Sequence, residues 1–270
     1  MTNRISIARI SRNGLIATFL AICCAVAARA GSLNKPSSAE LAAITARGRM
    51  LAEYDAAAWQ ATDAVLATHP KSEPSGRYIG HKTDAGWVVD FGYLNEAGDK
   101  FVVNYEAAQA GARFEVKSFN PERQDTGWNL SAARGMKIAL ADFSGPDHPY
   151  NIAVLPAEGE SLYVYLYPAQ VKAGVYPLGA DVRYRLSPDG MKIIEKRQMH
   201  KSIIESVSAD PKVKVESGYH THVLSEAPED TDVMLVLTRQ PRVPEIVVTQ
   251  TYMYTIGIDG KITVEDRPKQ

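Results

Sequence analysis

The sequence predicts an α+β protein that has a long N-terminal helix, one further helix and mainly antiparallel β-sheet in both halves. Two observations lead to this fold class. A helical pattern of apolar residues extends without a break over residues 38–67. Most of the chain that follows alternates between apolar and polar residues, in short runs separated by Gly, Pro, Asn and Asp. The first pattern is typical of an amphipathic helix and the second of antiparallel strands.

The predicted helix over 38–67 begins at a capping box, since Ser37 and Glu40 have the required spacing. Apolar residues then recur at near-helical spacing, at Leu41, Ile44, Leu51, Ala58 and Val65. Gly48 is a position at which the helix can bend. At about 1.5 Å per residue the helix would extend about 45 Å. This length suits either packing across a sheet of its own domain or projection as an arm that binds a partner.

The chain after the helix predicts two strand-rich regions. The first holds a hairpin and a third strand, at residues 86–94, 101–105 and 114–119. Its aromatic residues would either form one face of the core or line a groove: Trp87, Phe91, Tyr93, Phe101 and Tyr105. Asp125-Thr126 can cap the second helix, which Gly145-Pro146 ends after Phe143.

The second strand-rich region starts after a boundary near residues 144–149, so the chain is divided into 31–148 and 149–270. Its predicted strands cover residues 150–155, 161–167, 181–186, 191–204, 212–224, 245–258 and 261–265. Pro188-Asp189-Gly190 predicts a tight turn, because Pro presets φ and Gly accepts positive φ. The apolar run 233–237 fits a buried strand or a short helix, and periodicity does not separate the two.

Residues 1–30 have the features of a secretory signal peptide. Three arginines precede an apolar run from Leu15 to Ala28, and Ala28-Arg29-Ala30 resembles a cleavage site. The apolar run is shorter than the roughly 20 residues of a spanning helix. The sequence therefore predicts an exported, soluble protein, periplasmic or extracellular, with no transmembrane segment after cleavage. A retained anchor and a lipoprotein attached at Cys23 are the alternatives.

Cleavage after Ala30 would have two chemical consequences. Both cysteines, Cys23 and Cys24, would be removed, which excludes thiol nucleophiles, thiolate zinc sites and redox chemistry from the mature chain. The four arginines and no acidic residue in 1–30 would change the net charge from −1 to −5. A mildly acidic chain of mixed signs does not predict nucleic-acid binding, so small molecules, peptides and envelope proteins are the expected partner classes.

The segment most like a functional site is Gly218-Tyr219-His220-Thr221-His222. Residues i and i+2 of a strand lie on the same face, so His220 and His222 would present two imidazoles side by side. Two imidazoles, a carboxylate and a water form a usual catalytic zinc shell. Asp232 or Asp230 would be the third ligand, and Glu195 or Glu205 would be the base that takes a proton from the bound water.

These residues resemble the JAMM metallopeptidase family, in which a His-Ser/Thr-His motif ends a strand and a Ser-x-x-Asp motif follows. The resemblance covers residues 212–262 and implies His220, His222 and Asp232 as ligands of a peptidase-like zinc site. Asp232 lies ten residues after His222, where the family has eleven, and Glu229 stands at the position of the family's serine. The stretch that carries the family's catalytic glutamate has no match in this chain.

Several alternatives remain beside a divalent-metal hydrolase at His220 and His222. His200 would join the two histidines if its strand lay next to theirs, and a three-histidine site would not need Asp232. The histidines would otherwise hydrogen-bond to neighbours or face solvent. The competing function is a noncatalytic periplasmic or envelope-associated binding protein that uses the hairpin 87–105 or the helix 38–67. For a metal site, donor atoms of His220, His222 and Asp232 should converge on a point about 2.0 to 2.2 Å from each.

Overall fold

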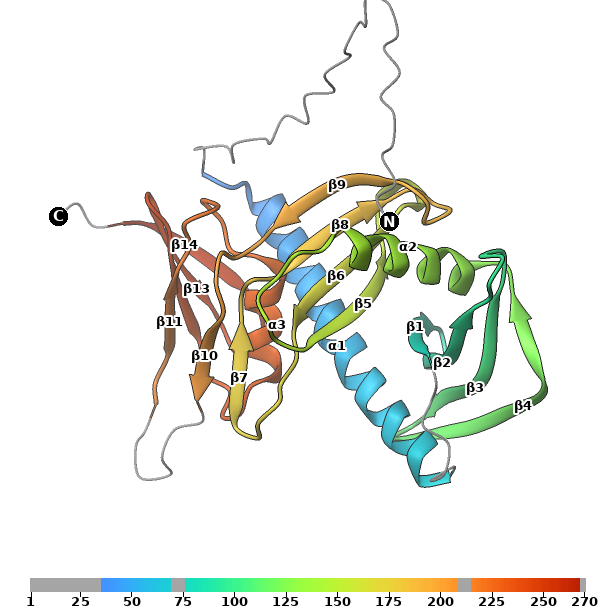
Figure 1. Ribbon diagram of the computed structural model, residues 1–270. Helices are drawn as coiled ribbons and strands as arrows, with labels where there is room; N and C mark the ends of the chain where they lie inside the picture. Colours follow the sequence, from blue (N-terminus) through green and yellow to red (C-terminus); the bar gives the residue numbers. More distant parts are fainter. Residues whose placement is uncertain (1–34, 69–75, 208–214, 268–270) are drawn as a thin grey trace, which may run out of the picture. The chain divides into compact units, whose positions relative to one another are not determined.

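The computed structural model describes residues 35–68, 76–207 and 215–267, and it has the α+β architecture expected from the sequence (Figure 1). The predicted signal peptide, with both cysteines, lies outside the described residues, as do residues 212–214 of one predicted strand. All of the described residues belong to one compact unit spanning 31–270. No helix among them is long and apolar enough to cross a membrane.

Helix α1 (Ser38–Thr68) is continuous and begins at the predicted capping box. The Ser37 backbone N–H donates to Glu40 Oε2 at 2.7 Å, and the Glu40 N–H donates to Ser37 Oγ at 3.2 Å. These two bonds satisfy backbone donors that the first turn of a helix leaves unpaired. The helix passes through Gly48 without interruption, and this glycine instead marks a close contact with another helix.

The first sheet has the order β1-β2-β3-β4, and all neighbouring strands are antiparallel. Its strands are β1 (Arg77–Thr83), β2 (Gly86–Leu94), β3 (Phe101–Ala110) and β4 (Arg113–Asp125). β3 and β4 are longer than the sequence predicted. Of the five aromatic residues in the hairpin, Trp87, Phe91 and Phe101 are buried in the core, while Tyr93 is 40% exposed. The hairpin therefore uses most of its aromatic side chains to pack against its own domain.

The second helix, α2 (Trp128–Asp142), leads to a second antiparallel sheet of order β5-β6-β8-β9. Its strands are β5 (Tyr150–Pro156), β6 (Leu162–Pro168), β8 (Val182–Leu186) and β9 (Ile193–Gln198), with a short 3-10 turn η1 (Glu158–Glu160) between the first two. The single strand predicted over 191–204 was wrong. The chain leaves this sheet after β9, and β10 (Ile204–Val207) pairs with β7 (Val175–Leu178) in a separate ribbon.

The third sheet has the order β11-β12-β13-β14. Its strands are β11 (Gly218–Thr221), β12 (Glu245–Val248), β13 (Tyr252–Ile256) and β14 (Ile262–Asp266). β11 is much shorter than the predicted strand 212–224, and it is parallel to β12, whereas the other pairs in this sheet are antiparallel. The predicted strand 245–258 is divided by a turn between β12 and β13.

The ambiguous run 233–237 belongs to a helix, α3 (Asp230–Thr238). Its residues Val233, Met234, Leu235 and Val236 are all buried. A helix that is covered on nearly every side has no polar face, so its sequence lacks the 3.6-residue alternation that would identify it. Because α3 is buried on nearly every side, the periodicity of its sequence did not distinguish a helix from a strand.

Helix α1 contributes residues to two of the three hydrophobic cores. Its middle and C-terminal part packs with the first sheet and with β5 and β6, and its first turns pack with α3 and the third sheet. Helix α2 lies in a core shared by the first and second sheets. The predicted regions 31–148 and 149–270 therefore share cores across their boundary, because residues on both sides of it pack on the same helix.

Gly48 permits the close approach of α1 to α3. A Cβ atom at this position would lie 2.5 Å from the Asp230 carbonyl oxygen and 2.5 Å from Val233 Cβ. Gly135, in α2, provides a contrast, because a Cβ atom there would lie no closer than 3.4 Å to Val164. The first glycine has no room for a methyl group, and the second does.

We expect Gly48→Ala to lower the free energy of unfolding by about 1 to 3 kcal/mol, because the added methyl overpacks the contact between α1 and α3. Gly135→Ala is the matched control and should raise it by about 0.4 to 1 kcal/mol, through helix propensity and a less flexible unfolded chain. Urea unfolding of both variants measures the difference. Equal effects of the two substitutions would contradict the close contact at Gly48.

Candidate metal centre

Three histidines and one aspartate from three separate segments come together beside α3. His200 follows β9, His220 lies in β11, His222 follows that strand directly, and Asp232 lies in the first turn of α3. The histidines are 6 to 8% exposed and Asp232 is fully buried. One donor atom from each residue lies within 4.8 Å of all the others. The chain thus places four potential metal ligands around one point.

The donor atoms are the three Nε2 nitrogens and the Asp232 carboxylate. His222 Nε2 lies 2.9 Å from His200 Nε2 and 3.1 Å from His220 Nε2. Asp232 Oδ1 lies 3.0 Å from the Nε2 of His200 and 3.1 Å from that of His220. Asp232 Oδ2 lies 3.1 Å from His222 Nε2. The Asp232 carboxylate and His222 Nε2 therefore each lie 2.9 to 3.1 Å from the other donors.

Each histidine has a hydrogen-bond acceptor at its other ring nitrogen. His200 Nδ1 lies 2.7 Å from Asp181 Oδ1, and His220 Nδ1 lies 2.7 Å from Glu245 Oε1. His222 Nδ1 lies 2.9 Å from the Ala227 carbonyl oxygen. We assign a proton to each Nδ1 because each faces an acceptor. In the neutral imidazole this leaves an Nε2 lone pair, and all three lone pairs face the centre of the group.

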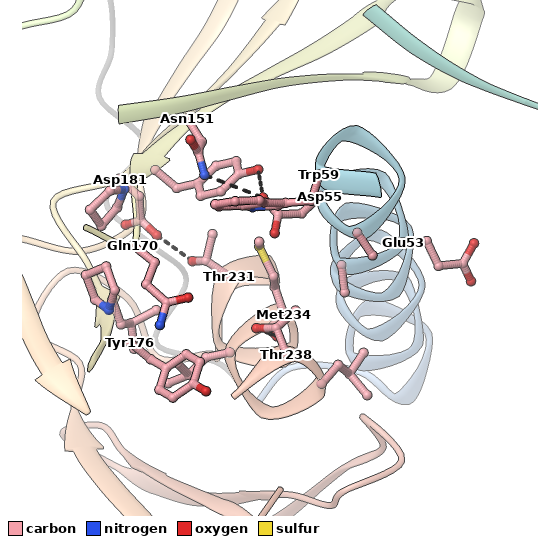
Figure 2. A pocket seen from close by; sticks show the side chains of 18 of the residues that line it. Glu53, Asp55, Trp59, Asn151, Gln170, Tyr176, Asp181, Thr231, Met234 and Thr238 are labelled. Atoms are coloured by element: carbon pink, nitrogen blue, oxygen red, sulfur yellow. Dashed lines mark hydrogen bonds between the residues drawn. The ribbon is translucent and has the colours of Figure 1, made fainter. Parts of the chain in front are cut away.

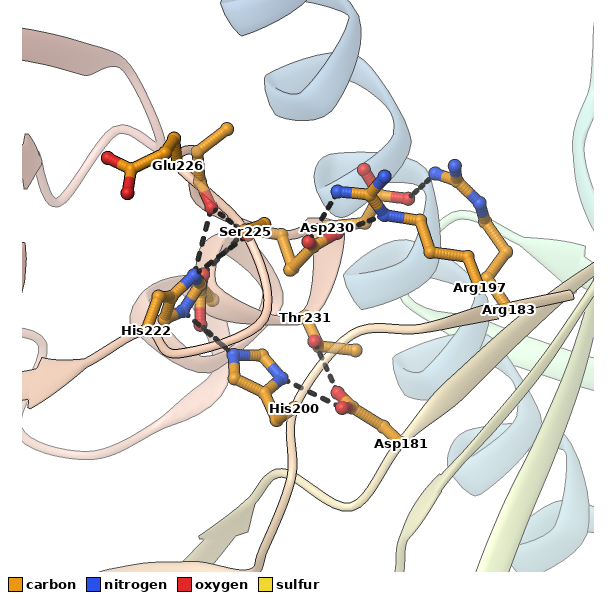
Figure 3. Close-up of polar contacts among 12 residues, drawn as sticks. Asp181, Arg183, Arg197, His200, His222, Ser225, Glu226, Asp230 and Thr231 are labelled. Atoms are coloured by element: carbon orange, nitrogen blue, oxygen red, sulfur yellow. Dashed lines mark hydrogen bonds and ion pairs between the residues drawn. The ribbon is translucent and has the colours of Figure 1, made fainter. Parts of the chain in front are cut away.

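Figure 3 shows His200 between its Nδ1 partner Asp181 on one side and His222 of the donor group on the other. Asp181 is itself held by α3, because the Thr231 hydroxyl donates to its Oδ2. Glu245 is held by Arg239, whose guanidinium also donates to the Val243 carbonyl oxygen at 2.8 Å. Carboxylates that orient ligating histidines in this way are typical of metal sites.

Gly218 leaves the room that Glu245 needs. It stands two residues before His220, and a Cβ atom there would lie 1.9 Å from Glu245 Oε2 and 2.5 Å from Arg239 Nη1. Any larger residue would displace the ion pair that orients His220. The glycine of the Gly-Tyr-His-Thr-His segment therefore has a steric role at the site.

The group stabilises positive charge at its centre. Burial lowers the pKa of the His200 imidazole, but Asp181 and Asp232 outweigh this effect and hold the pKa well above its usual range. Burial also lowers the pKa of His220, and hydrogen bonds to Asp232 and Glu245 raise it to about 9. Burial raises the pKa of Asp232, while His222 and His200 lower it to well below its usual range. Protons or a metal cation can supply this charge.

A tetrahedral zinc ion fits the spacing of the four donors. With bonds of about 2.0 to 2.1 Å, zinc ligands lie about 3.3 Å apart. The contacts from His222 Nε2 to the other two Nε2 atoms and from the Asp232 carboxylate to all three Nε2 atoms are 2.9 to 3.1 Å. An outward shift of a few tenths of an ångström in each donor would accommodate the ion. The imidazole and carboxylate donors also suit this metal.

Helix α3 orients Asp232 through its own N-terminus. The Glu229 backbone N–H donates to Asp232 Oδ2 at 2.7 Å, and the positive end of the helix dipole favours a carboxylate in the first turn. Glu229 is buried as well, and its carboxylate receives two hydrogen bonds from Arg197, at 2.6 and 2.9 Å. Contacts within the protein therefore fix the start of α3 without a bound ligand.

Asp230, the alternative third ligand, is not part of the group. Its buried carboxylate accepts hydrogen bonds from Arg47 of α1, Arg183 of β8 and the hydroxyl of Tyr165 in β6 (Figure 3 labels Arg183 and Asp230). Residues two apart on a helix point about 200° away from each other. Asp232 therefore faces the three histidines, and Asp230 faces the opposite side of α3. Asp230 ties α3 to α1 and to the second sheet.

The two predicted bases are also outside the group. Glu195 and Glu205 are exposed, on β9 and β10 respectively, and neither belongs to the set of converging donors. His200 was named as a possible third histidine, and it does lie with the other two. Asp181 and Glu245 were missed, because nothing near either residue in the sequence indicates a histidine partner 19 or 25 positions away.

Comparison with family models, curated proteins and solved structures yields no match to this chain. The resemblance to JAMM metallopeptidases therefore stays a prediction. The structure adds one donor, His200, to the ligands that the resemblance implies.

We expect Asp230→Asn to lower the free energy of unfolding by about 3 to 5 kcal/mol, because Arg47 and Arg183 would be left partly buried without a carboxylate. Glu53→Gln is the control, since it breaks an ion pair with Lys82 in which both side chains are nearly half exposed, and should cost about 0 to 1 kcal/mol. Urea unfolding provides both values. A loss below about 1 kcal/mol in Asp230→Asn would refute the linking role of Asp230.

Proposed function

We propose that this chain is an exported metal-binding protein that holds a divalent transition metal, zinc first, between His200, His220, His222 and Asp232. The observation that carries the proposal is the convergence of three Nε2 atoms on one carboxylate while a separate acceptor faces each Nδ1. Three inward lone pairs and a carboxylate repel one another unless protons or a metal cation lie between them, and the proposal is that a metal cation does so. Export follows from the signal-peptide pattern of residues 1–30.

In this function the metal joins segments that are far apart in the sequence. The ion would connect the turn after β9, the end of β11 and the first turn of α3. Four protein donors complete a tetrahedral shell, which is the arrangement of structural zinc sites. Because the unfolded chain does not hold these donors together, binding would stabilise the folded state.

Zinc at about 100 times its Kd should raise the free energy of unfolding by about 2.7 kcal/mol, which corresponds to a rise in Tm of about 5 to 10 °C. Elemental analysis of protein purified without chelator should give about one metal ion per chain. His222→Ala should lose both the ion and the rise in Tm, because the remaining donors leave a gap on one side.

His148→Ala is the matched control for this experiment. His148 is a partly buried histidine whose Nε2 lies 3.0 Å from the Ala169 carbonyl oxygen, and it is not part of the donor group. This variant should keep the metal and the full rise in Tm. Metal content below about 0.1 per chain in the wild-type protein, together with an unchanged Tm in zinc, would overturn the proposal.

A metal-dependent hydrolase, acting on peptides as the sequence resemblance implies, is the second candidate. The observation that favours it is the presence of three histidines, since three imidazoles and a water also form a catalytic zinc shell. Asp232 would then accept a proton from the bound water instead of completing the shell. The two functions differ in whether the metal keeps an open position.

The cobalt-substituted protein should distinguish these two functions. If Asp232 completes the shell, added azide has no position to bind and the visible spectrum should remain unchanged. If a water occupies the fourth position, azide should replace it and change the spectrum, and the zinc form should cleave an unstructured peptide mixture at a rate that His222→Ala abolishes. A spectrum insensitive to azide combined with no cleavage would exclude the hydrolase.

A further inference from the structure

A cavity of about 760 Å³ lies between α1, α3, β6 and β7. Figure 2 shows side chains from both helices and from the strands pointing into it. Its size lies within the range that small-molecule sites occupy. It is separate from the donor group of the metal centre, although Asp181 and Thr231, which support His200, form part of its wall.

Asp55 of α1 presents an unpaired carboxylate oxygen at this cavity. The Tyr167 hydroxyl donates to Asp55 Oδ1 at 2.8 Å, and Asn151 Nδ2 approaches the same oxygen at 3.5 Å. Within the described ranges, no donor reaches Oδ2 and no basic side chain pairs with Asp55. Figure 2 shows Asn151 reaching toward Asp55. The other oxygen is left for a ligand.

The other acidic residues of the cavity are already engaged. Glu53 pairs with Lys82 at 2.5 Å. Both oxygens of Asp181 are occupied, by His200 and Thr231. Arg49, a basic residue of the cavity, donates to the Asp259 carbonyl oxygen. Arg242 also lines the cavity, but it does not pair with Asp55. The open negative charge is therefore at Asp55.

The surroundings of Asp55 suit a cation that carries an aliphatic chain. Trp59 lies one helical turn after Asp55, on the same face of α1, and its side chain is 55% exposed. An indole face attracts an ammonium group that binds beside it. Ala52, Ala56 and Met234 contribute apolar wall, against which methylene groups can pack.

We propose that this cavity binds a primary ammonium group on an aliphatic chain, with the ammonium donating to Asp55 Oδ2 beside Trp59. A primary ammonium suits the site better than a quaternary one, because Oδ2 accepts a hydrogen bond and a quaternary nitrogen has none to donate. The proposal is independent of the metal centre, since it uses none of the four metal donors.

The energetics of Asp55 agree with a cationic ligand. Burial raises the pKa of its carboxyl group, and the Tyr167 hydrogen bond offsets this only in part. A buried carboxylate without a cation is costly to keep charged. A bound ammonium would supply the missing opposite charge, and water is the alternative partner for Oδ2.

Calorimetric titration of the full-length purified protein with hexylamine tests the proposal. The wild-type protein should bind with a Kd below about 10 mM. Asp55→Asn, which keeps the shape and removes the charge, should weaken binding at least about tenfold. Asp63→Asn makes the same charge change at an exposed position of α1 and should leave the Kd unchanged. 1-Hexanol, which has the same chain without the charge, should bind at least about tenfold more weakly than hexylamine.

Three results of this titration would each overturn the proposed binding of an ammonium group in the cavity. Absence of binding to the wild-type protein overturns the proposal, and so does equal affinity of Asp55→Asn and wild type. Equal binding of hexanol and hexylamine would also overturn it, because the cavity would then recognise only the chain. Coordination of the amine by a metal ion would not depend on Asp55, so the same variant separates that event from binding in the cavity. Thermal unfolding of Asp55→Asn, which should be unchanged or slightly raised, verifies that this variant is folded.

Discussion

The packing of α3 against α1 is the contact on which the rest of the structure depends. At Gly48 the helices approach more closely than any side chain would permit, and the Asp230 carboxylate binds Arg47 and Arg183 directly beside this contact. Together these interactions fix where α3 begins and how it is rotated. The rotation aims Asp232 at the three histidines, and it aims Thr231 at Asp181.

The candidate metal centre is assembled from elements that this contact holds in place. His200 comes from the end of the second sheet and His220 from the third, so the donor group lies where the two sheets meet at α3. Every donor has a second partner that orients it: Asp181, Glu245, the Ala227 carbonyl or the Glu229 N–H. Such support limits the rotation of each ligand and lowers the entropic cost of binding an ion.

The candidate metal centre and the cavity beside Asp55 share a wall. Thr231 and Asp181 lie on that wall, and Asp181 also holds the Nδ1 of His200. Asp55 lies on α1, on another side of the cavity. Tyr167 donates to its Oδ1, and its Oδ2 makes no hydrogen bond within the described residues. The fold therefore places two chemically different candidate sites on two sides of the same short helix. One is a group of three imidazoles and a carboxylate that could hold a cation, and the other is a cavity with one open carboxylate.

The sequence by itself determined the features that depend on local periodicity and spacing. These are the long helix with its Ser37–Glu40 cap, the hairpins, and the placement of His220 and His222 as neighbours. Tertiary structure alone decided the rest. It made a helix of 233–237, because burial on all sides removes periodicity, and it divided the strand 191–204, so that His200 turns toward the other histidines. It also directs Asp232, and not Asp230, toward the three histidines, and it places Asp181 and Glu245 at the Nδ1 atoms of His200 and His220. These choices depend on which distant segments pack together, and neither spacing nor composition encodes that packing locally.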